Sequence, residues 1–436
     1  MLSRSDTHQN NKQKRRRRLK RLLILNITML LLISGVSGLL WANHKGWINL
    51  ASDNRSNGTD GSPDSGGSKT PGAGSNEANS EGEKESVPEE GLVGEDENSP
   101  DPAGQDNATV PEGDASEDDR TVLLAFVGDI LLAGSVQDLM KRHGFDYPYA
   151  KALSYLSDAD LTAGNLENPI TERGTPAENK QYVFKGAPNL LPSLKEAGFD
   201  IVSLANNHTL DQGVEGLFDT MRHLDEAGIA HTGAGKDDTE AFTPTVLEAN
   251  GIKVAYFGLS RVVPLNEWKA DRNYPGVAET YNTTRAVNAI RKAEEEADVT
   301  VVLVHWGKEL ADDPEEYQRA FAREYIDAGA DLVIGAHPHV LQGFEQYKGK
   351  WIAYSLGNFI FNITTYELST ETGVLDAKCM KTGDCSLRLH PMKVDSLRPS
   401  QPAPLEGDEA VRLLNRVSEL SFNVLIDKEG NIVPRE

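Results

Sequence analysis

From Thr121 onward, short apolar runs alternate with amphipathic stretches whose apolar residues recur at a helical spacing. Strands are predicted at residues 121–129, 158–167, 199–208, 252–260, 299–307, 330–340 and 350–361. Helices are predicted at residues 191–198, 214–228, 283–297 and 315–329. Because strands that alternate with helices imply right-handed crossovers, residues 121–363 are predicted to form one α/β domain with a largely parallel sheet covered on both faces.

The last part of the chain, residues 364–436, has a different pattern. It contains a strand-like segment at 386–394, a proline-rich bend and a helical pattern near 409–420. We expect a C-terminal extension that packs on the α/β domain. Cys379 and Cys385 are the two cysteines of the chain. Outside the cytoplasm such a close pair favours a structural disulfide over a metal site, which would need more ligands nearby.

The N-terminal part is organised around one apolar run. Residues 22–41 carry no charge over twenty positions, which matches the thickness of a bilayer as a helix. Residues 1–21 hold nine lysines and arginines against one acid. The positive-inside rule therefore predicts a cytoplasmic basic tail, a single-pass transmembrane anchor in the cell membrane and an extracellular C-terminal domain. The alternative is a cleaved signal peptide, but the run is long and lacks a good cleavage motif.

Residues 42–120 are rich in Gly, Ser, Pro and Glu and contain almost no large apolar side chain. Between residues 51 and 120 there are nineteen acids and four bases, so a disordered acidic linker is predicted. The whole chain of 436 residues has a net charge of −23. An acidic body repels phosphate, which argues against nucleic acid as a partner.

Coordinating side chains recur where the predicted strands end. They are Asp129, Asn165, Glu167, Asn207, His208, His305, His337 and His339. The carboxyl ends of strands in an α/β sheet converge on one crevice, so these groups can meet around a single centre. The mixture of nitrogen and oxygen ligands suits Mn, Fe or Zn.

Each of these residues also has a purely structural interpretation. Asp129 could cap a helix beginning at Leu131, Glu167 could be a solvated loop carboxylate, and any single histidine could be a hydrogen-bonded structural residue. The coincidence of five successive strand ends favours a metal or polar catalytic centre.

Six short motifs follow one another along residues 122–361: VGD, GNLE, ANNH, VHWG, GAHPH and SLGNF. In this order they resemble the bacterial CapA family of capsule and poly-gamma-glutamate synthesis proteins, which is similar in fold to calcineurin-like metallophosphoesterases. The resemblance implies a metallophosphoesterase-like α/β sandwich that binds one or two divalent ions. It does not extend to the acidic linker or to the C-terminal extension.

The resemblance also implies roles for individual residues. The metal ligands would be Asp129, Glu167, Asn207, His305, His337 and His339, and His208 would protonate the leaving group. Two departures put a second ion in doubt. Leu131 stands where metallophosphoesterases have a histidine, and an Asn-Leu-Glu segment replaces their short Gly-Asp bridge.

Four further residues are candidates for supporting the centre or binding substrate. Asn165 lies beside Glu167, and Asn358 belongs to the last motif. Lys185 would suit an anionic ligand such as a polyglutamate carboxylate, or would simply be solvated beside a packed strand. Arg261 follows a predicted strand near the same crevice and could pair with a carboxylate, or lie on the surface.

Three functions remain open from the sequence. The leading hypothesis is a membrane-anchored CapA-like protein of capsule or poly-gamma-glutamate biosynthesis or export, with the anionic polymer and membrane synthase subunits as partners. A general metal-dependent phosphoesterase at the cell surface is the second. The third is a non-catalytic subunit of a membrane synthase. An active centre would be a metal-dependent hydrolase of phosphoester or amide bonds, because an ion that polarises P=O also polarises C=O.

Overall fold

The computed structural model describes residues 120–435 except 179, 363–365 and 396. The predicted basic tail, the transmembrane anchor and the linker up to residue 119 therefore lie outside the described residues. Among the described residues, none of the helices has the length and apolar character needed to cross a membrane.

The first sheet is mixed and has ten strands. Its parallel part consists of β1 (Thr121–Ile130), β2 (Leu161–Leu166), β3 (Phe199–Ser203) and β4 (Ala230–Thr232), with the short β13 (Asn358–Ile360) also parallel to β1. Its antiparallel part consists of β14 (Glu371–Met380), β15 (Cys385–Asp395), β16 (Arg398–Pro404), β17 (Val424–Ile426) and β18 (Asn431–Pro434). The two parts join where β14 pairs antiparallel with β1.

The second sheet is also mixed, in the order β11-β12-β10-β9-β7-β6. Its strands are β6 (Thr245–Ala249), β7 (Ile252–Ser260), β9 (Val299–His305), β10 (Leu332–Ala336), β11 (Phe344–Tyr347) and β12 (Lys350–Ala353). The central strands β7, β9, β10 and β12 are parallel, and the two edge strands are antiparallel. A small third sheet pairs β5 (Ala234–Gly235) with β8 (Gly276–Val277).

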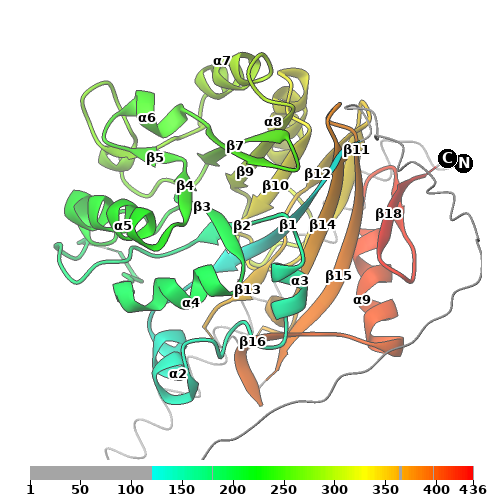
Figure 1. The fold of residues 1–436 in the computed structure, drawn as a ribbon, viewed down its shortest axis with the longest axis horizontal. Helices are drawn as coiled ribbons and strands as arrows, with labels where there is room; N and C mark the ends of the chain where they lie inside the picture. The colour runs from blue at the N-terminus through cyan, green and yellow to red at the C-terminus, as the bar shows by residue number, and fades with distance from the viewer. Residues whose placement is uncertain (1–119, 179, 363–365, 396, 436) are drawn as a thin grey trace, which may run out of the picture. The chain divides into compact units, whose positions relative to one another are not determined.

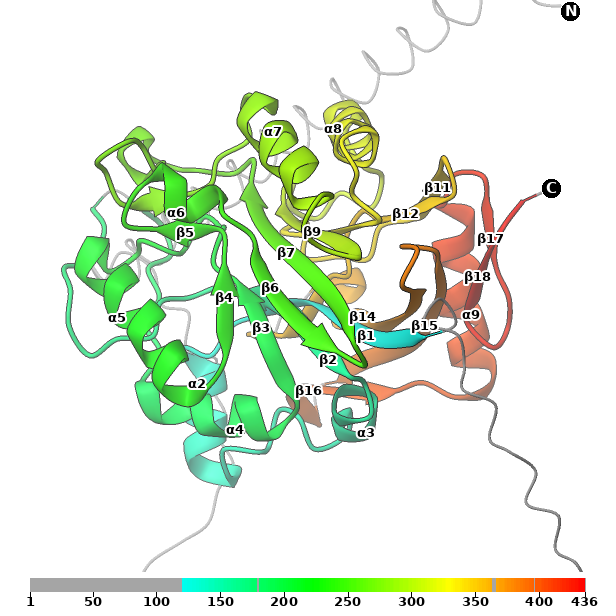
Figure 2. The same ribbon diagram turned by 45° about the horizontal axis from the view of Figure 1, so that its top comes forward.

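The two large sheets pack against each other and helices cover their outer faces, except that the helix Gly407–Glu419 packs into the cluster between the sheets (Figures 1 and 2). The helices are α2 (Ser135–His143), α3 (Leu153–Ser157), α4 (Leu191–Glu196), α5 (Gly213–Ala227), α6 (Asp238–Phe242), α7 (Thr284–Ala293), α8 (Glu316–Asp327) and α9 (Gly407–Glu419). Three single-turn 3₁₀ segments are η2 (Pro188–Leu190), η3 (Asn266–Trp268) and η4 (Glu367–Thr370). The four helices predicted between residues 191 and 329 are confirmed.

The core explains why the strand sequences are continuously apolar. Leu124 and Phe126 of β1 pack between the two sheets together with Val301 of β9. Ala125 and Val127 of β1 face the opposite way, under α2, α4 and α5. A second outer cluster lies between the other sheet and α6, α7 and α8. Strands buried on both faces need apolar residues at every position, not at alternate ones.

The expectation of one largely parallel sheet was wrong in its topology. The parallel strands are divided between two sheets, and both sheets carry antiparallel strands. Residues after 370, interpreted from the sequence as an extension, supply five strands to the sheet that contains β1. The structure contains the disulfide between Cys379 and Cys385, which links the β14–β15 hairpin at its turn.

Candidate metal centre

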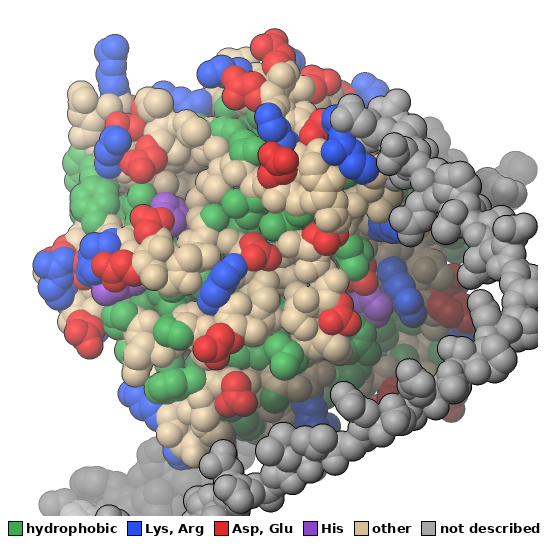
Figure 3. All heavy atoms as spheres, viewed as in Figure 1, with side chains coloured by type: hydrophobic (Ala, Val, Ile, Leu, Met, Phe, Trp, Pro, Cys, Tyr) green, Lys and Arg blue, Asp and Glu red, His purple; other side chains and the backbone are tan. Residues whose placement is uncertain are grey.

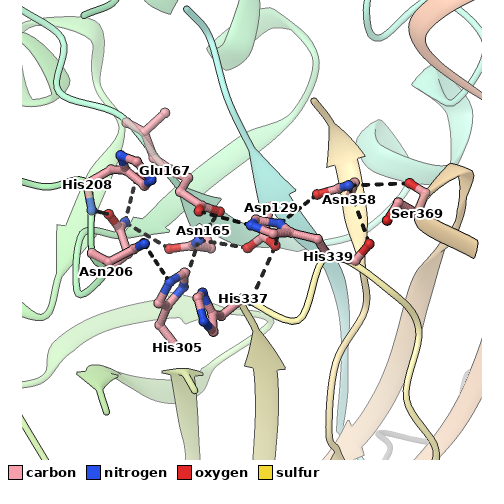
Figure 4. A network of polar contacts seen from close by, with 12 residues as sticks. Asp129, Asn165, Glu167, Asn206, His208, His305, His337, His339, Asn358 and Ser369 are labelled. Carbon is pink, nitrogen blue, oxygen red and sulfur yellow. Dashed lines mark hydrogen bonds and ion pairs between the residues drawn. The ribbon is translucent and has the colours of Figure 1, made fainter. Parts of the chain in front are cut away.

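The coordinating residues meet at the carboxyl ends of the parallel strands, between the two sheets (Figure 4). In the first sheet Asp129 of β1 pairs in register with Asn165 of β2 and with Asn358 of β13. In the second sheet His305 is the last residue of β9 and pairs with Ala336, the last residue of β10. The strand registers therefore bring together groups that are far apart in the sequence.

Asp129 is fully buried and forms the middle of this cluster. The Asn165 amide donates to Asp129 Oδ1 over 2.8 Å, and the His337 backbone N–H donates to Oδ2 over 3.3 Å. His339 Nδ1 lies 3.1 Å from the same Oδ2. The interpretation of Asp129 as a helix cap was wrong, since the next helix begins at Ser135 and has Gly134 before it.

Glu167 is also fully buried, which excludes the interpretation as a solvated loop carboxylate. Its Oε2 accepts a long hydrogen bond of 3.4 Å from the Asn165 amide. Its Oε1 lies 3.7 Å from His339 Nε2 and has no hydrogen-bond partner. A buried carboxylate oxygen without a donor is costly unless another positive group completes its environment.

His305 is held by two asparagines. Its Nδ1 lies 3.3 Å from the Asn165 amide nitrogen, and its Nε2 lies 3.0 Å from Asn207 Oδ1. Because an amide oxygen only accepts, the contact with Asn207 fits a neutral ring with its proton on Nε2.

The turn after β10 holds two histidines in an unusual backbone conformation. His337 has a φ of 98° and His339 a φ of 58°. Side chains other than glycine rarely adopt positive φ, and such residues concentrate at functional sites where the surroundings over-determine them. Here both imidazoles reach the cluster from one short turn.

The donor set fits a divalent cation. Two groups of three residues have ligand atoms within 4.8 Å of one another: Glu167, His337 and His339, and Asp129, Glu167 and His305. Glu167 belongs to both groups. Its Oε1 and His337 Nδ1 are both buried without a hydrogen-bond partner. Both atoms are ligands that Mn, Fe and Zn accept.

The electrostatics of the two carboxylates point the same way. Burial opposes ionisation of Asp129, but the contact with His339 outweighs it and lowers the pKa of Asp129. Burial, followed by repulsion from Asp129, raises the pKa of Glu167 well above its usual range. A second negative charge is therefore unfavourable here unless a cation is present, and a bound cation reverses that balance.

The histidines differ in protonation. Burial, with His339 as a further cause, lowers the pKa of His337 to about 3, and burial lowers the pKa of His305 well below its usual value. For His339, burial is outweighed by the hydrogen bond that its ring donates to Asp129, so the pKa of His339 is raised. His305 and His337 are thus neutral at physiological pH, as a metal ligand must be.

His208 lies at one end of the cluster, near Glu167 (Figure 4). Its Nδ1 lies 2.7 Å from Asp211 Oδ2 and 2.8 Å from Lys180 Nζ. Lys180 also forms an ion pair with Asp211 and donates to the Asn207 carbonyl over 2.5 Å. With Nδ1 engaged, Nε2 remains the ring position available for proton transfer. Burial lowers the pKa of His208, although Asp211 partly opposes the shift.

Lys180 and Asp211 were not predicted from the sequence, and Asn206 was predicted only as a turn residue of the ANNH motif. Asn206 donates from its amide to Asn165 Oδ1 over 3.0 Å and to the Leu166 carbonyl over 2.8 Å, which fixes the loop after β3. Asp211 follows His208 by three residues, and that spacing was the available signal. Lys180 lies in a loop without periodicity, so no sequence pattern pointed to it.

Other predicted residues divide into two groups. Asn358 belongs to the cluster, because its Oδ1 lies 2.9 Å from His339 Nδ1. Lys185 is exposed and donates to the Glu172 carbonyl over 3.4 Å, so its described contacts do not bring it to the centre. Arg261 is half-buried beside two tyrosines. Leu131 is fully buried and supplies no ligand.

Residues 123–363 match the family model described as bacterial capsule synthesis protein PGA_cap. This chain belongs to the PGA_cap family. That match confirms the family resemblance inferred from the six motifs.

Two curated relatives carry related names. The chain is 33% identical over 252 residues to the capsule biosynthesis protein CapA of Bacillus anthracis, covering 56% of this chain and 61% of that protein. It is 30% identical over 313 residues to the PGA biosynthesis protein CapA of Bacillus subtilis (strain 168), covering 70% of this chain and 81% of that protein. Among solved structures, the NAD nucleotidase of Haemophilus influenzae shows 14% identity and a TM-score of 0.38, with 70% of this chain and 64% of that chain covered.

Proposed function

We propose that this PGA_cap protein is a membrane-anchored accessory protein of capsule or poly-gamma-glutamate synthesis whose buried centre hydrolyses a bond in an anionic substrate. The family and the names of its relatives support the polymer. The basic block at residues 1–21 and the apolar run at residues 22–41 support a single-pass anchor with the folded domain outside the cell.

One observation carries the hydrolytic part of the proposal. Asp129 and Glu167 are both fully buried, and their side chains contact each other as well as imidazole, amide and backbone groups. Among the described residues, neither carboxylate forms an ion pair with a lysine or an arginine. Buried acids are normally paired or coordinate a metal, so we infer a metallophosphoesterase-like centre for Mn, Fe or Zn.

The residues of this chain have distinct tasks in the proposed reaction. Asp129, Glu167, His305, His337 and His339 would hold the ion, with Asn207 beside His305. A divalent ion supplies Lewis acidity and lowers the pKa of water toward neutrality. Asp211 and Lys180 fix the ring of His208 through Nδ1, so that its Nε2 can deliver a proton to the leaving group.

A non-catalytic subunit of a membrane synthase complex is the second candidate function. Leu131 favours it, because a buried leucine stands where the resemblance to metallophosphoesterases calls for an imidazole. In that role the centre would stabilise the fold and present a surface to the synthase without turnover.

Metal content combined with a substrate panel tests the proposal. Purified full-length protein is expected to contain Mn, Fe or Zn by elemental analysis, and the double substitution His337→Ala, His339→Ala is expected to remove it. His390→Ala is the matched control, because His390 pairs with Asp376 outside the centre. If the wild type contains no more metal than the double variant, the proposed metal centre would be contradicted.

The substrate panel separates the candidate functions. Cleavage of an oligomer of gamma-linked glutamate, lost in Glu167→Ala, would support a polymer hydrolase. Turnover of an aryl phosphate alone would indicate a general phosphoesterase. A metal-loaded protein that turns over neither substrate would indicate the non-catalytic subunit.

A further inference from the structure

An acidic protein that handles a polyanion needs a local group of cations to bind it. On the face shown in Figure 3, acidic and basic side chains are interspersed and do not separate by sign. A subsite for a polyanion would therefore consist of individual cations that have no acidic partner.

Arg261 is such a cation. Its guanidinium carbon lies 4.0 Å from the ring centroid of Tyr281 and 5.1 Å from that of Tyr317. Its Nε is buried and has no hydrogen-bond partner. Within the part of the chain that the structure describes, Arg261 forms no ion pair. An arginine that is partly desolvated without a counter-ion has unused donors in its planar fork.

Other half-buried arginines differ from Arg261 in this respect. Arg319 and Arg323 both pair with the buried Glu345, and Arg416 pairs with the buried Glu371. Among the described residues, the nearby acid Glu279 forms no ion pair with Arg261, and its carboxylate accepts a hydrogen bond of 2.6 Å from the Tyr281 backbone. Arg261 is therefore held by aromatic faces in place of an acid.

Both tyrosine rings are fixed through their hydroxyls. The Tyr281 hydroxyl accepts from the Val263 backbone N–H over 3.2 Å, and the Tyr317 hydroxyl accepts from the Gly307 N–H over 2.7 Å. A guanidinium that lies over fixed rings is held in a defined orientation, and cation–π attraction compensates part of its lost hydration. The fork is thus preorganised for a planar anion.

The position of Arg261 connects it to the metal centre. Ser260, the residue before it, pairs in register with His305, and the Arg261 N–H donates to the His305 carbonyl over 2.8 Å. Arg261 therefore leaves the sheet at the edge where the coordinating residues gather. A second cation, Lys269, has its Nζ 4.6 Å from the same Tyr281 ring and has no ion pair among the described residues.

We propose that Arg261, held between Tyr281 and Tyr317 and supported by Lys269, is a subsite for a carboxylate of the polymeric substrate. This carboxylate belongs to a residue next to the bond that is cleaved. This inference rests on the proposed function, because it assumes that a chain with repeated carboxylates crosses the centre. The bidentate fork matches a carboxylate in geometry and charge. The subsite would select an acidic repeat and set its register relative to His208 and Glu167.

Binding of defined oligomers to the full-length protein tests the subsite. Arg261→Gln is expected to weaken binding of a gamma-linked oligoglutamate by about tenfold or more, since charged hydrogen bonds are lost. Arg261→Lys is expected to restore little, because an ammonium lacks the planar fork. Arg272→Gln, at an exposed position in the neighbouring loop, is the matched control and should bind like the wild type.

A neutral oligomer of gamma-linked glutamine and inorganic phosphate complete the experiment. The neutral oligomer should bind equally weakly to the wild type and to Arg261→Gln. Equal affinity of both proteins for oligoglutamate, at equal metal content, would overturn the subsite and leave the metal centre standing. If Arg261→Gln weakens the binding of inorganic phosphate but not of oligoglutamate, Arg261 would instead bind a phosphoester. A wild type that binds neither anion would overturn both the subsite and the proposed polymer.

Discussion

Two buried glutamates in this molecule, Glu345 and Glu167, are surrounded by different kinds of partners. Glu345 of β11 is 1% exposed and contacts Arg319, Arg323 and the Tyr354 hydroxyl, which donates to it over 2.7 Å. Glu167 is equally buried, but it contacts one amide, one imidazole and the Asp129 carboxyl group, and one of its oxygens has no hydrogen-bond donor.

This difference separates a buried acid that serves the fold from one that we assign to a binding site. At Glu345 the chain supplies its own cations from α8, so the site is complete within the fold. At Glu167 the chain supplies neutral and weakly basic groups, and in the proposed function a bound ion balances the charge. Removing a charge should therefore have opposite consequences for stability at the two positions: loss of the arginines at Glu345 destabilises the fold, and loss of the Glu167 charge in the absence of metal stabilises it.

The largest effect on stability is expected at Glu345. The double substitution Arg319→Met, Arg323→Met leaves a buried carboxylate without its cations and should lower the free energy of unfolding by about 3 kcal/mol. Urea unfolding followed by circular dichroism measures this loss. Metal content should not change. A variant that keeps its stability and loses its metal would break the distinction between the two sites.

A smaller effect of opposite sign is expected for Glu167→Gln in protein treated with a chelator. The raised pKa of Glu167 means that the folded protein binds this proton more tightly than the unfolded chain. Stability contributed by the protonated form is therefore lost as pH rises above about 4.3, the ordinary value. At pH 7.5 the glutamine variant should be more stable than the wild type by about 1 kcal/mol.

Adding Mn²⁺ should reverse that order. The ion stabilises the wild type by mass action and leaves Glu167→Gln almost unchanged. Thermal unfolding with and without the ion checks the reversal. Glu345→Gln is the control and should be destabilised in both conditions. A wild type that gains nothing from Mn²⁺, Fe²⁺ or Zn²⁺ would argue that Glu167 is buried for another reason.

The smallest effect is expected at Asp219, an acid paired with exposed arginines. The hydrogen bond from Arg173 is the main cause that lowers the pKa of Asp219. Because the folded pKa is depressed, the stabilisation is present above about pH 3.9 and is lost as pH falls through the folded value. Asp219→Asn should cost about 0.5–1 kcal/mol at pH 7, since Arg173 is 62% exposed.

Unfolding curves at pH 7 and pH 3 test this third case. The difference between the wild type and Asp219→Asn should shrink at the lower pH. A difference that stays constant would mean that the hydrogen bond from the Thr171 hydroxyl, over 2.6 Å, matters more than the ion pair.

The sequence predicted which side chains gather at the strand ends better than it predicted the architecture. Asp129, Glu167, His305 and His339 follow apolar runs, so their positions at strand ends follow from local pattern alone. The pairing of β1 with β14 joins Thr121 to Met380, and no local signal specifies a partner that distant. Arg319 and Arg323 were missed because charges on an amphipathic helix are typical of a solvated face.

The β1–β14 ladder has a practical consequence for preparing this protein. Residues Thr121–Phe126 pair in register with Leu375–Met380, although the family model ends at residue 363. A recombinant fragment trimmed to that boundary would leave the backbone of the strand that carries Asp129 unpaired along one side, and such bare strands promote aggregation. Expression plasmids for crystallisation should therefore continue through β18, although all strands from β14 onward lie outside the recognised family region.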